Sequence, residues 1–485
     1  MKPFSGTGHF RRYHAYYFAA LILMLFLLLR LLSGFNGLYG QDSHEYYRYA
    51  LRWKEFLSGG AHPGDYFWPM HYPVYGALMM FLIPGTALAQ QFISMLSMAL
   101  LLLYTARLIR RYSPRVDMGT VYGYLFLVGF LSPFLFQSAF LVMSDMLAAF
   151  LTTAAIYHLL KYREEQGRGD LLWGVFFGIS AVNTRYPAAM VLLVPAVLAA
   201  GVFFRHFRWR QLLYALLILF VCLLPHLYIR GSGSGDFLAH DGLLTWSPLN
   251  GFMRSFVTAD GKASYRMPNL LYSFSNWFYP GFICIGASLL LWVQKRDLRP
   301  AGYALLLPLL LYSVLLAGIP YQNMRYQLLT FPLVLVLLFP AFQRLREKYL
   351  KARTVMLLAA TGLILIQGGL IYKYSQRIYQ SNQMEQQVAR ALRAYPGRPL
   401  YTFWIDGALR SYGVTNPVTN LWQERLTTLA PEALVLFNEP QFREQWADKN
   451  PMVNWRYIQN HYSLVQIDSL AGGWKLYEER GAKSE

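Results

Sequence analysis

The chain has 485 residues, of which 55% are hydrophobic and only 14% are charged, and its apolar residues gather in long runs. Because one membrane-spanning helix takes about 20 apolar residues, this pattern excludes a soluble globular protein and indicates a polytopic membrane protein. The formal net charge of +19 is spread over short basic clusters between the runs, as in proteins oriented by positive charge, so no nucleic-acid partner is expected.

The positions of the cysteines and the lack of N-glycosylation acceptor sites indicate the kind of protein and its cellular origin. Cys222 and Cys284 lie in different apolar runs, so the chain offers neither a disulfide framework nor a cysteine metal cluster. An N-x-S/T acceptor site is absent from the sequence, which favours a bacterial over a eukaryotic luminal protein. We therefore expect a multi-pass protein of the bacterial cytoplasmic (inner) membrane, surrounded by membrane lipids.

Apolar runs taken as spans, with Lys/Arg clusters on the cytoplasmic side, predict about eleven transmembrane helices and a cytoplasmic N-terminus. The first run, Tyr16–Leu32, is longer than a usual signal-peptide core and is expected to be a retained span. The other spans are expected near Leu88–Ile109, Met118–Leu135, Met143–Leu160, Leu171–Val182, Ala188–Phe204, Leu212–Ile229, Leu270–Val293, Ala301–Gly318, Leu328–Phe342 and Val355–Tyr372.

The long loops then fall on the outer face. In the first of them, Tyr72–Pro84 is too short for a span and predicts a helix lying at the interface. A later outer loop, GSGSGDFLAHDG, lacks the phosphate-loop pattern and is predicted to be a flexible linker.

After Tyr372 the composition becomes that of a soluble domain. A helix is expected to begin near Asn382, with Glu385 completing its cap, and further helices near Gln441–Asp448 and Trp455–Tyr462. Strands are expected at LYTFWI, ALVLF, LVQID and WKLYEE. The expected architecture is therefore an all-α membrane bundle over residues 1–372, followed by a small periplasmic α/β domain over residues 373–485.

Asp42 stands in GQDSHEYYRYALR, just after the first span, with Glu45 one helical turn further on. A carboxylate at the membrane surface is exposed, paired or used in function. Asp42 fits either an N-cap, a common use of aspartate before an amphipathic helix, or an active carboxylate. We favour the active carboxylate.

Four more charged residues lie at the expected outer ends of spans. Asp145 serves either as a helix cap or as a second acid in a polar cavity. Arg185 and Arg325 either snorkel to lipid headgroups or form an anion pocket, because guanidinium binds phosphate oxygens in a fixed fork. Arg30 either snorkels, pairs with Asp42 or Asp145, or contacts phosphate, and we favour pairing. His71 and Tyr72 lack metal-ligand spacing and are assigned to substrate binding, so no protein metal site is predicted.

Sugar transfer from a lipid phosphate suits this set of residues. The leaving group is already a stabilised phosphate, so the enzyme needs a base for the acceptor hydroxyl and cations for the released phosphate. A transporter or flippase of lipid-linked sugars, or a scaffold protein, is the alternative. Against transport, the chain shows no internal repeat and its charges lie at the outer edge.

The ordered set QDSHEYYRYA, WPMHYPVYGALM, Ser144–Asp145, GISAVNTRYP and RYQLLTFPLVLVLLFPA resembles the type C glycosyltransferases, in the branch that holds protein O-mannosyltransferases and the lipid A aminoarabinose transferase. The resemblance covers roughly residues 16–372 and implies a multi-span bundle with interfacial helices in the first outer loop.

For the site, the resemblance implies a polyprenyl-phosphate-linked sugar donor, transfer with inversion, and a lipid, glycan or protein acceptor. Asp42 matches the catalytic aspartate, and Arg325 with Tyr326 matches the late-loop position near the donor phosphate. Glu45 and Asp145 are assigned to substrate binding. Ser43 and His44 follow Asp42 where the family often has a second acid, which leaves the use of a divalent cation open.

Overall fold

The computed structural model describes residues 7–84, 87–230, 245–258, 261–298, 300–349, 353–422, 425–445 and 450–483, so the predicted Gly-rich linker lies outside the described residues. The chain forms two compact units. The first comprises residues 1–37, 49–252 and 267–374, and the second comprises residues 38–48, 253–266 and 375–485. The second unit therefore includes two segments of the predicted outer loops as well as the C-terminal tail.

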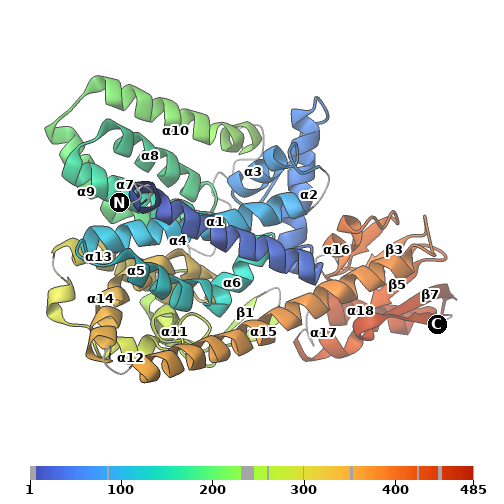
Figure 1. Ribbon diagram of the computed structural model, residues 1–485. Helices are drawn as coiled ribbons and strands as arrows, with labels where there is room; N and C mark the ends of the chain where they lie inside the picture. Colours follow the sequence, from blue (N-terminus) through green and yellow to red (C-terminus); the bar gives the residue numbers. More distant parts are fainter. Residues whose placement is uncertain are drawn as a thin grey trace. The chain divides into compact units, whose positions relative to one another are not determined.

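The first unit is helical (Figure 1). Two further helices run through both units: α2 (Gly40–Leu57) begins in the second unit, and α15 (Arg353–Leu392) ends in it. The main helices of the first unit are α1 (Thr7–Ser33), α3 (His71–Met79), α4 (Leu88–Tyr112), α5 (Met118–Tyr124), α6 (Pro133–Phe140), α7 (Asp145–Glu165), α8 (Arg168–Val182), α9 (Ala188–Arg205), α10 (Trp209–Arg230), α13 (Pro300–Gly318) and α14 (Phe331–Tyr349).

Helix α7 packs against α4, α8 and α9 in the first unit. Its first twelve residues, DMLAAFLTTAAI, are all buried. The alanines and threonines in this stretch let neighbouring backbones approach closely, which is how helices associate where lipid removes the hydrophobic drive. The start of α7, at Asp145, is therefore held on several sides.

Five helices of the described chain are long and apolar enough to cross a membrane: His14–Ser33, Leu88–Tyr112, Ala188–Arg205, Trp209–Arg230 and Thr354–Leu392. Met118–Phe130 and Pro133–Phe140 would make a sixth crossing, although they meet at a bend of 74°. Pro133 explains the break, because proline lacks the N–H that would continue the preceding helix. The structure thus has several apolar helices, but the predicted number of about eleven spans is not confirmed.

The prediction of one continuous span at Leu270–Val293 is wrong. The segment forms only short pieces: α11 (Asn269–Tyr272), a 3-10 turn at Ser275–Trp277 and α12 (Gly286–Leu290). Pro280 removes a helix donor, and Gly281 packs against the Phe134 ring while its carbonyl accepts a hydrogen bond from Phe134 N at 2.9 Å. Tertiary contacts of this kind cannot be read from an apolar run.

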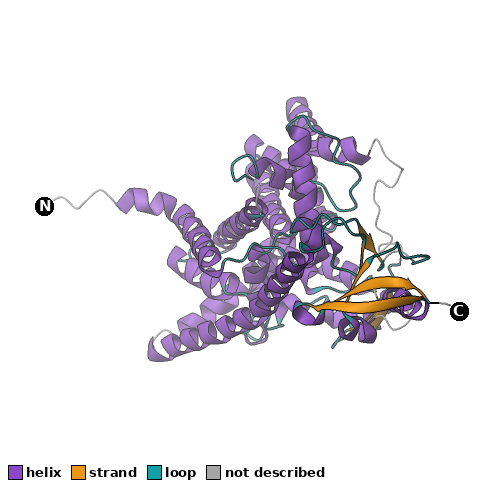
Figure 2. Cartoon of the chain, turned by 90° about the vertical axis from the view of Figure 1, so that its right-hand side faces the viewer, coloured by secondary structure: helices purple, strands orange, loops and turns teal. Residues whose placement is uncertain are grey.

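The second unit contains a five-stranded sheet in the order β4-β3-β5-β7-β6 (Figure 2). Strands β4, β3 and β5 are parallel, whereas β7 is antiparallel to both β5 and β6. All four residues of β5 are buried, and Trp455, Trp474 and Phe403 complete the core beside it. The elements are β3 (Leu400–Thr402), α16 (Asp406–Ser411), β4 (Val418–Asn420), β5 (Leu434–Phe437), α17 (Glu439–Gln445), α18 (Asn450–His461), β6 (Tyr462–Ser469) and β7 (Lys475–Ala482), with a separate hairpin of β1 (Ser255–Thr258) and β2 (Gly261–Ser264).

The four strands predicted in the tail are present, and β4 is an additional, three-residue strand. The predicted helix start at Asn382 is wrong, because α15 runs without interruption from Arg353 to Leu392. Neither glycine nor proline occurs between Tyr372 and Asn382, so nothing ends the helix there. Asn382 and Glu385 instead make long-range contacts within the second unit.

Substitution of Gly286 tests the broken segment, because a Cβ at this position would clash with the backbone oxygen of Trp277. We expect Gly286→Ala to destabilise the protein by about 1–3 kcal/mol, since the backbone must move. Gly368→Ala in α15, where nothing lies within 4 Å, is the matched control and should be neutral or stabilising by up to about 1 kcal/mol. Thermal unfolding in detergent measures both; an unchanged Tm for Gly286→Ala would contradict this packing.

Candidate functional site

Asp145, Arg185 and Arg325 form an ion cluster in the first unit. One carboxylate oxygen of Asp145 accepts a short hydrogen bond from Arg185 Nη1. The other accepts from Arg325 Nε at 3.0 Å and lies 2.9 Å from Arg325 Nη2. The structure therefore brings together three of the predicted site residues, which are up to 180 positions apart in the sequence.

Three different elements position these side chains. Asp145 begins α7, and Arg185 lies in the turn between α8 and α9, where its N–H donates to Ala181 O at 2.8 Å. Arg325 lies in the 3-10 helix η6 (Met324–Leu329). The element that carries each of the three residues thus holds its backbone in place, and the side chain extends from there to the cluster.

Two residues that the sequence reasoning missed hold η6. Asn323 caps it, with its side-chain oxygen accepting from Arg325 N at 3.0 Å, and Tyr312 OH donates to Tyr326 O at 3.0 Å. Asparagine before a short helix is a recognisable cap signal, so Asn323 was within reach of sequence reasoning. Tyr312 was not, because its contact depends on how α13 packs.

The cluster combines one negative and two positive side chains and has a net charge of +1. The Asp145 side chain is 1% exposed, whereas those of Arg185 and Arg325 are 19% and 26% exposed. The Arg185 guanidinium lies 5.5 Å from the centroid of the Tyr326 ring, a cation–π distance. A buried carboxylate thus holds two partly accessible guanidiniums, an arrangement suited to an anion such as phosphate.

His71 and Tyr72 are buried at the start of α3 and bond to neighbouring helices. His71 Nε2 lies 2.7 Å from Cys222 O, and Tyr72 OH bonds to Ser94 Oγ at 3.0 Å. Arg30 lies in the last turn of α1, and no ion pair between Arg30 and Asp145 occurs among the described residues. The described contacts of His71 and Tyr72 are packing contacts. Substrate binding by His71 and Tyr72, and phosphate contact by Arg30, stay predictions.

Asp42 and Glu45 lie in the part of α2 that belongs to the second unit. Asp42 is the third residue of the helix and not its N-cap, and an acid in the first turn is favoured by the helix dipole. Glu45 Oε1 accepts from Arg48 Nη1 at 2.6 Å, so it forms an ion pair within its own helix. Convergence of Asp42 with the arginine cluster stays a prediction.

The described residues contain no group of three or more His, Cys, Asp or Glu side chains that could hold a metal ion. Two residues near Asp42 in the sequence, His44 and Glu45, could join it in such a group. His44 bonds to Glu385, and Glu45 bonds to Arg48. The use of a divalent cation, which the resemblance leaves open, is not tested by these contacts and stays a prediction.

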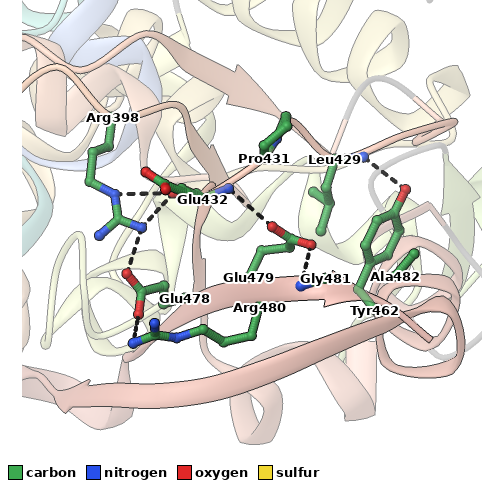
Figure 3. A pocket seen from close by; sticks show the side chains of 10 residues that line it. All are labelled: Arg398, Leu429, Pro431, Glu432, Tyr462, Glu478, Glu479, Arg480, Gly481 and Ala482. Atoms are coloured by element: carbon green, nitrogen blue, oxygen red, sulfur yellow. Dashed lines mark hydrogen bonds and ion pairs between the residues drawn. The ribbon is translucent and has the colours of Figure 1, made fainter.

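A hollow of about 690 Å³ lies in the second unit, beside β6 and β7 (Figure 3). Glu478 pairs with Arg398 at 2.8 Å and also with Arg480, while the Glu479 carboxylate accepts from the backbone N–H of Glu432 at 3.0 Å. None of the predicted site residues lines this hollow.

Comparison with solved structures identifies the fold. No protein-family model matches the chain, and no curated protein sequence matches it. The structure of ArnT from Cupriavidus metallidurans bound to undecaprenyl phosphate superimposes with a TM-score of 0.58 at 15% identity, covering 94% of this chain and 97% of that one. The apo structure of the same protein gives a TM-score of 0.56 at 14% identity, covering 95% and 98%. ArnT, the lipid A aminoarabinose transferase, has the type C glycosyltransferase fold, and this chain shares that fold, as the resemblance in its sequence predicted.

Proposed function

We propose that this protein is an integral membrane glycosyltransferase that moves a sugar from a polyprenyl-phosphate-linked donor to an acceptor hydroxyl on the outer face of the membrane. The observation that carries the proposal is the Asp145–Arg185–Arg325 cluster, which offers two partly exposed guanidiniums to an anion. The fold shared with ArnT, one structure of which holds undecaprenyl phosphate, supports a lipid-linked phosphate as that anion.

In the proposed reaction, Asp42 accepts the proton of the acceptor hydroxyl as that oxygen attacks the anomeric carbon. The bond from the anomeric carbon to the phosphate oxygen breaks, and its electron pair leaves with the polyprenyl phosphate. Attack opposite the leaving group inverts the anomeric centre. Arg185 and Arg325 stabilise the charge on the departing phosphate.

Asp42→Asn tests the base. Because asparagine cannot accept the proton, we expect sugar transfer to fall at least about 100-fold, as is typical when a general base is removed. Purified protein is incubated with a panel of polyprenyl-phosphate-linked sugars and a membrane extract, and products are read by mass spectrometry. Asp468→Asn, the same substitution in β6, should retain activity. Normal turnover in Asp42→Asn removes this residue from the reaction, and movement of unaltered lipid-linked sugar across the membrane supports transport instead.

Arg325→Lys tests the phosphate site. Lysine keeps the charge but loses the planar fork, so we expect the KM for the lipid-linked donor to rise about tenfold, corresponding to about 1.4 kcal/mol. Arg344→Lys is the matched control, because Arg344 also binds an aspartate, Asp297, through two guanidinium nitrogens and lies in a predicted cytoplasmic cluster. If the two substitutions change the donor KM equally, Arg325 has no specific part in donor binding.

Thiol labelling tests the orientation, in which the N-terminus is cytoplasmic and the second unit periplasmic. In a background without Cys222 and Cys284, Ser469→Cys on exposed β6 should react with a membrane-impermeant maleimide in cells with a permeabilised outer membrane. Pro114→Cys, exposed between α4 and α5, should react only after the inner membrane is opened. The reverse pattern would place Asp42 on the cytoplasmic face and overturn the proposed function.

A further inference from the structure

The segment that carries Asp42 is built into the C-terminal unit. Residues 38–48, which include the first turns of α2, belong to the same compact unit as residues 375–485. Side-chain hydrogen bonds between described residues join these two segments at Leu38, Gln41 and His44, each within four positions of Asp42.

The first contact is a buried pair between His44 and Glu385. His44 is 1% exposed and Glu385 is 8% exposed, and His44 Nε2 lies 3.1 Å from Glu385 Oε2. A carboxylate only accepts, so with Glu385 ionised the imidazole Nε2–H donates. The Tyr412 ring meets the imidazole edge-on, with centroids 5.5 Å apart. Loss of one member leaves the other buried without its partner, which is costly.

The second contact joins Gln41 to an unusual backbone. Gln41 Nε2 donates to Trp404 O at 2.8 Å, and Trp404 has a φ of +69°. A bulky residue in the left-handed region carries strain of about 1–3 kcal/mol and persists where surrounding contacts over-determine it. The Trp422 ring packs edge-on against Trp404 at 4.6 Å. This turn presents the Trp404 carbonyl to α2.

The third contact precedes the helix. Asn382 Nδ2 in α15 donates to Leu38 O at 2.7 Å and bonds to Tyr412 OH at 2.7 Å. The chain is thus anchored immediately before α2 as well as within its first turns.

The anchors lie on a different side of the helix from Asp42. Gln41 and His44 are three residues apart and share one face, whereas Asp42 points about 100° away from Gln41 and about 160° away from His44 at 3.6 residues per turn. Anchoring this face fixes the rotation of α2 about its axis. The rotation in turn sets the direction of the Asp42 carboxylate.

We propose that the C-terminal unit orients the catalytic base, with His44 and Glu385 as positioning residues that act through Asp42. This inference rests on the proposed function. It gives the C-terminal unit a part in catalysis, in place of a role confined to acceptor capture or stability.

The test compares Glu385→Ala with Glu385→Gln. Glutamine keeps an oxygen that accepts from His44, so it should retain most of kcat, whereas alanine should lower kcat about tenfold and leave the donor KM within about twofold. Because residues that act as a unit are not additive, Glu385→Ala should cause no further loss in an Asp42→Asn background. A purely structural contact would lower the residual rate there as well.

Glu478→Ala is the matched control, since Glu478 also forms ion pairs in the second unit but touches no part of α2 among the described residues. If Glu385→Ala does not fold, Gln41→Ala replaces it, with the same expected loss of kcat. A folded variant with normal kcat overturns the positioning role when Asp42→Asn is inactive. Normal turnover by Asp42→Asn would instead overturn the proposed base itself.

Discussion

The ion cluster at the start of α7 is the interaction on which the rest of the candidate site depends. A carboxylate at 1% exposure is tolerated only with partners, and Asp145 obtains them from the α8–α9 turn and from η6. The cluster therefore ties three distant segments of the first unit to one point. The same contacts hold two guanidiniums in place, which the proposed binding of a lipid phosphate needs.

The residues of the proposed reaction are divided between the two units of the chain. The arginines belong to the helical first unit, whereas Asp42 begins a helix that is anchored in the second. Because α2 and α15 each run through both units, the two units are linked by continuous helices. Catalysis and the folding of the C-terminal unit are coupled if His44 and Glu385 orient the base.

Local patterns failed where tertiary contacts outweighed them. The apolar composition of Leu270–Val293 is that of a span, yet its backbone is broken, and in the broken segment Gly281 lies against Phe134 and Gly286 against Trp277. Asn382 and Glu385 have the spacing of a helix cap, yet they lie inside a 40-residue helix and bond to Leu38 and His44. In each case the residue types allowed two uses, and the partner that decided between them is distant in sequence.

The sequence by itself determined the helical membrane class and the small C-terminal sheet, because apolar runs and strand alternation are local properties. Its resemblance to the type C glycosyltransferases indicated the fold that the structure shows. The sequence also pointed to Asp145, Arg185 and Arg325, since charge is scarce at the ends of spans. Only the tertiary structure decided that these three pair with one another, that Glu45 pairs with Arg48, and that His44 reaches Glu385. Pairing depends on which helix ends meet, and that is settled by packing of the whole chain.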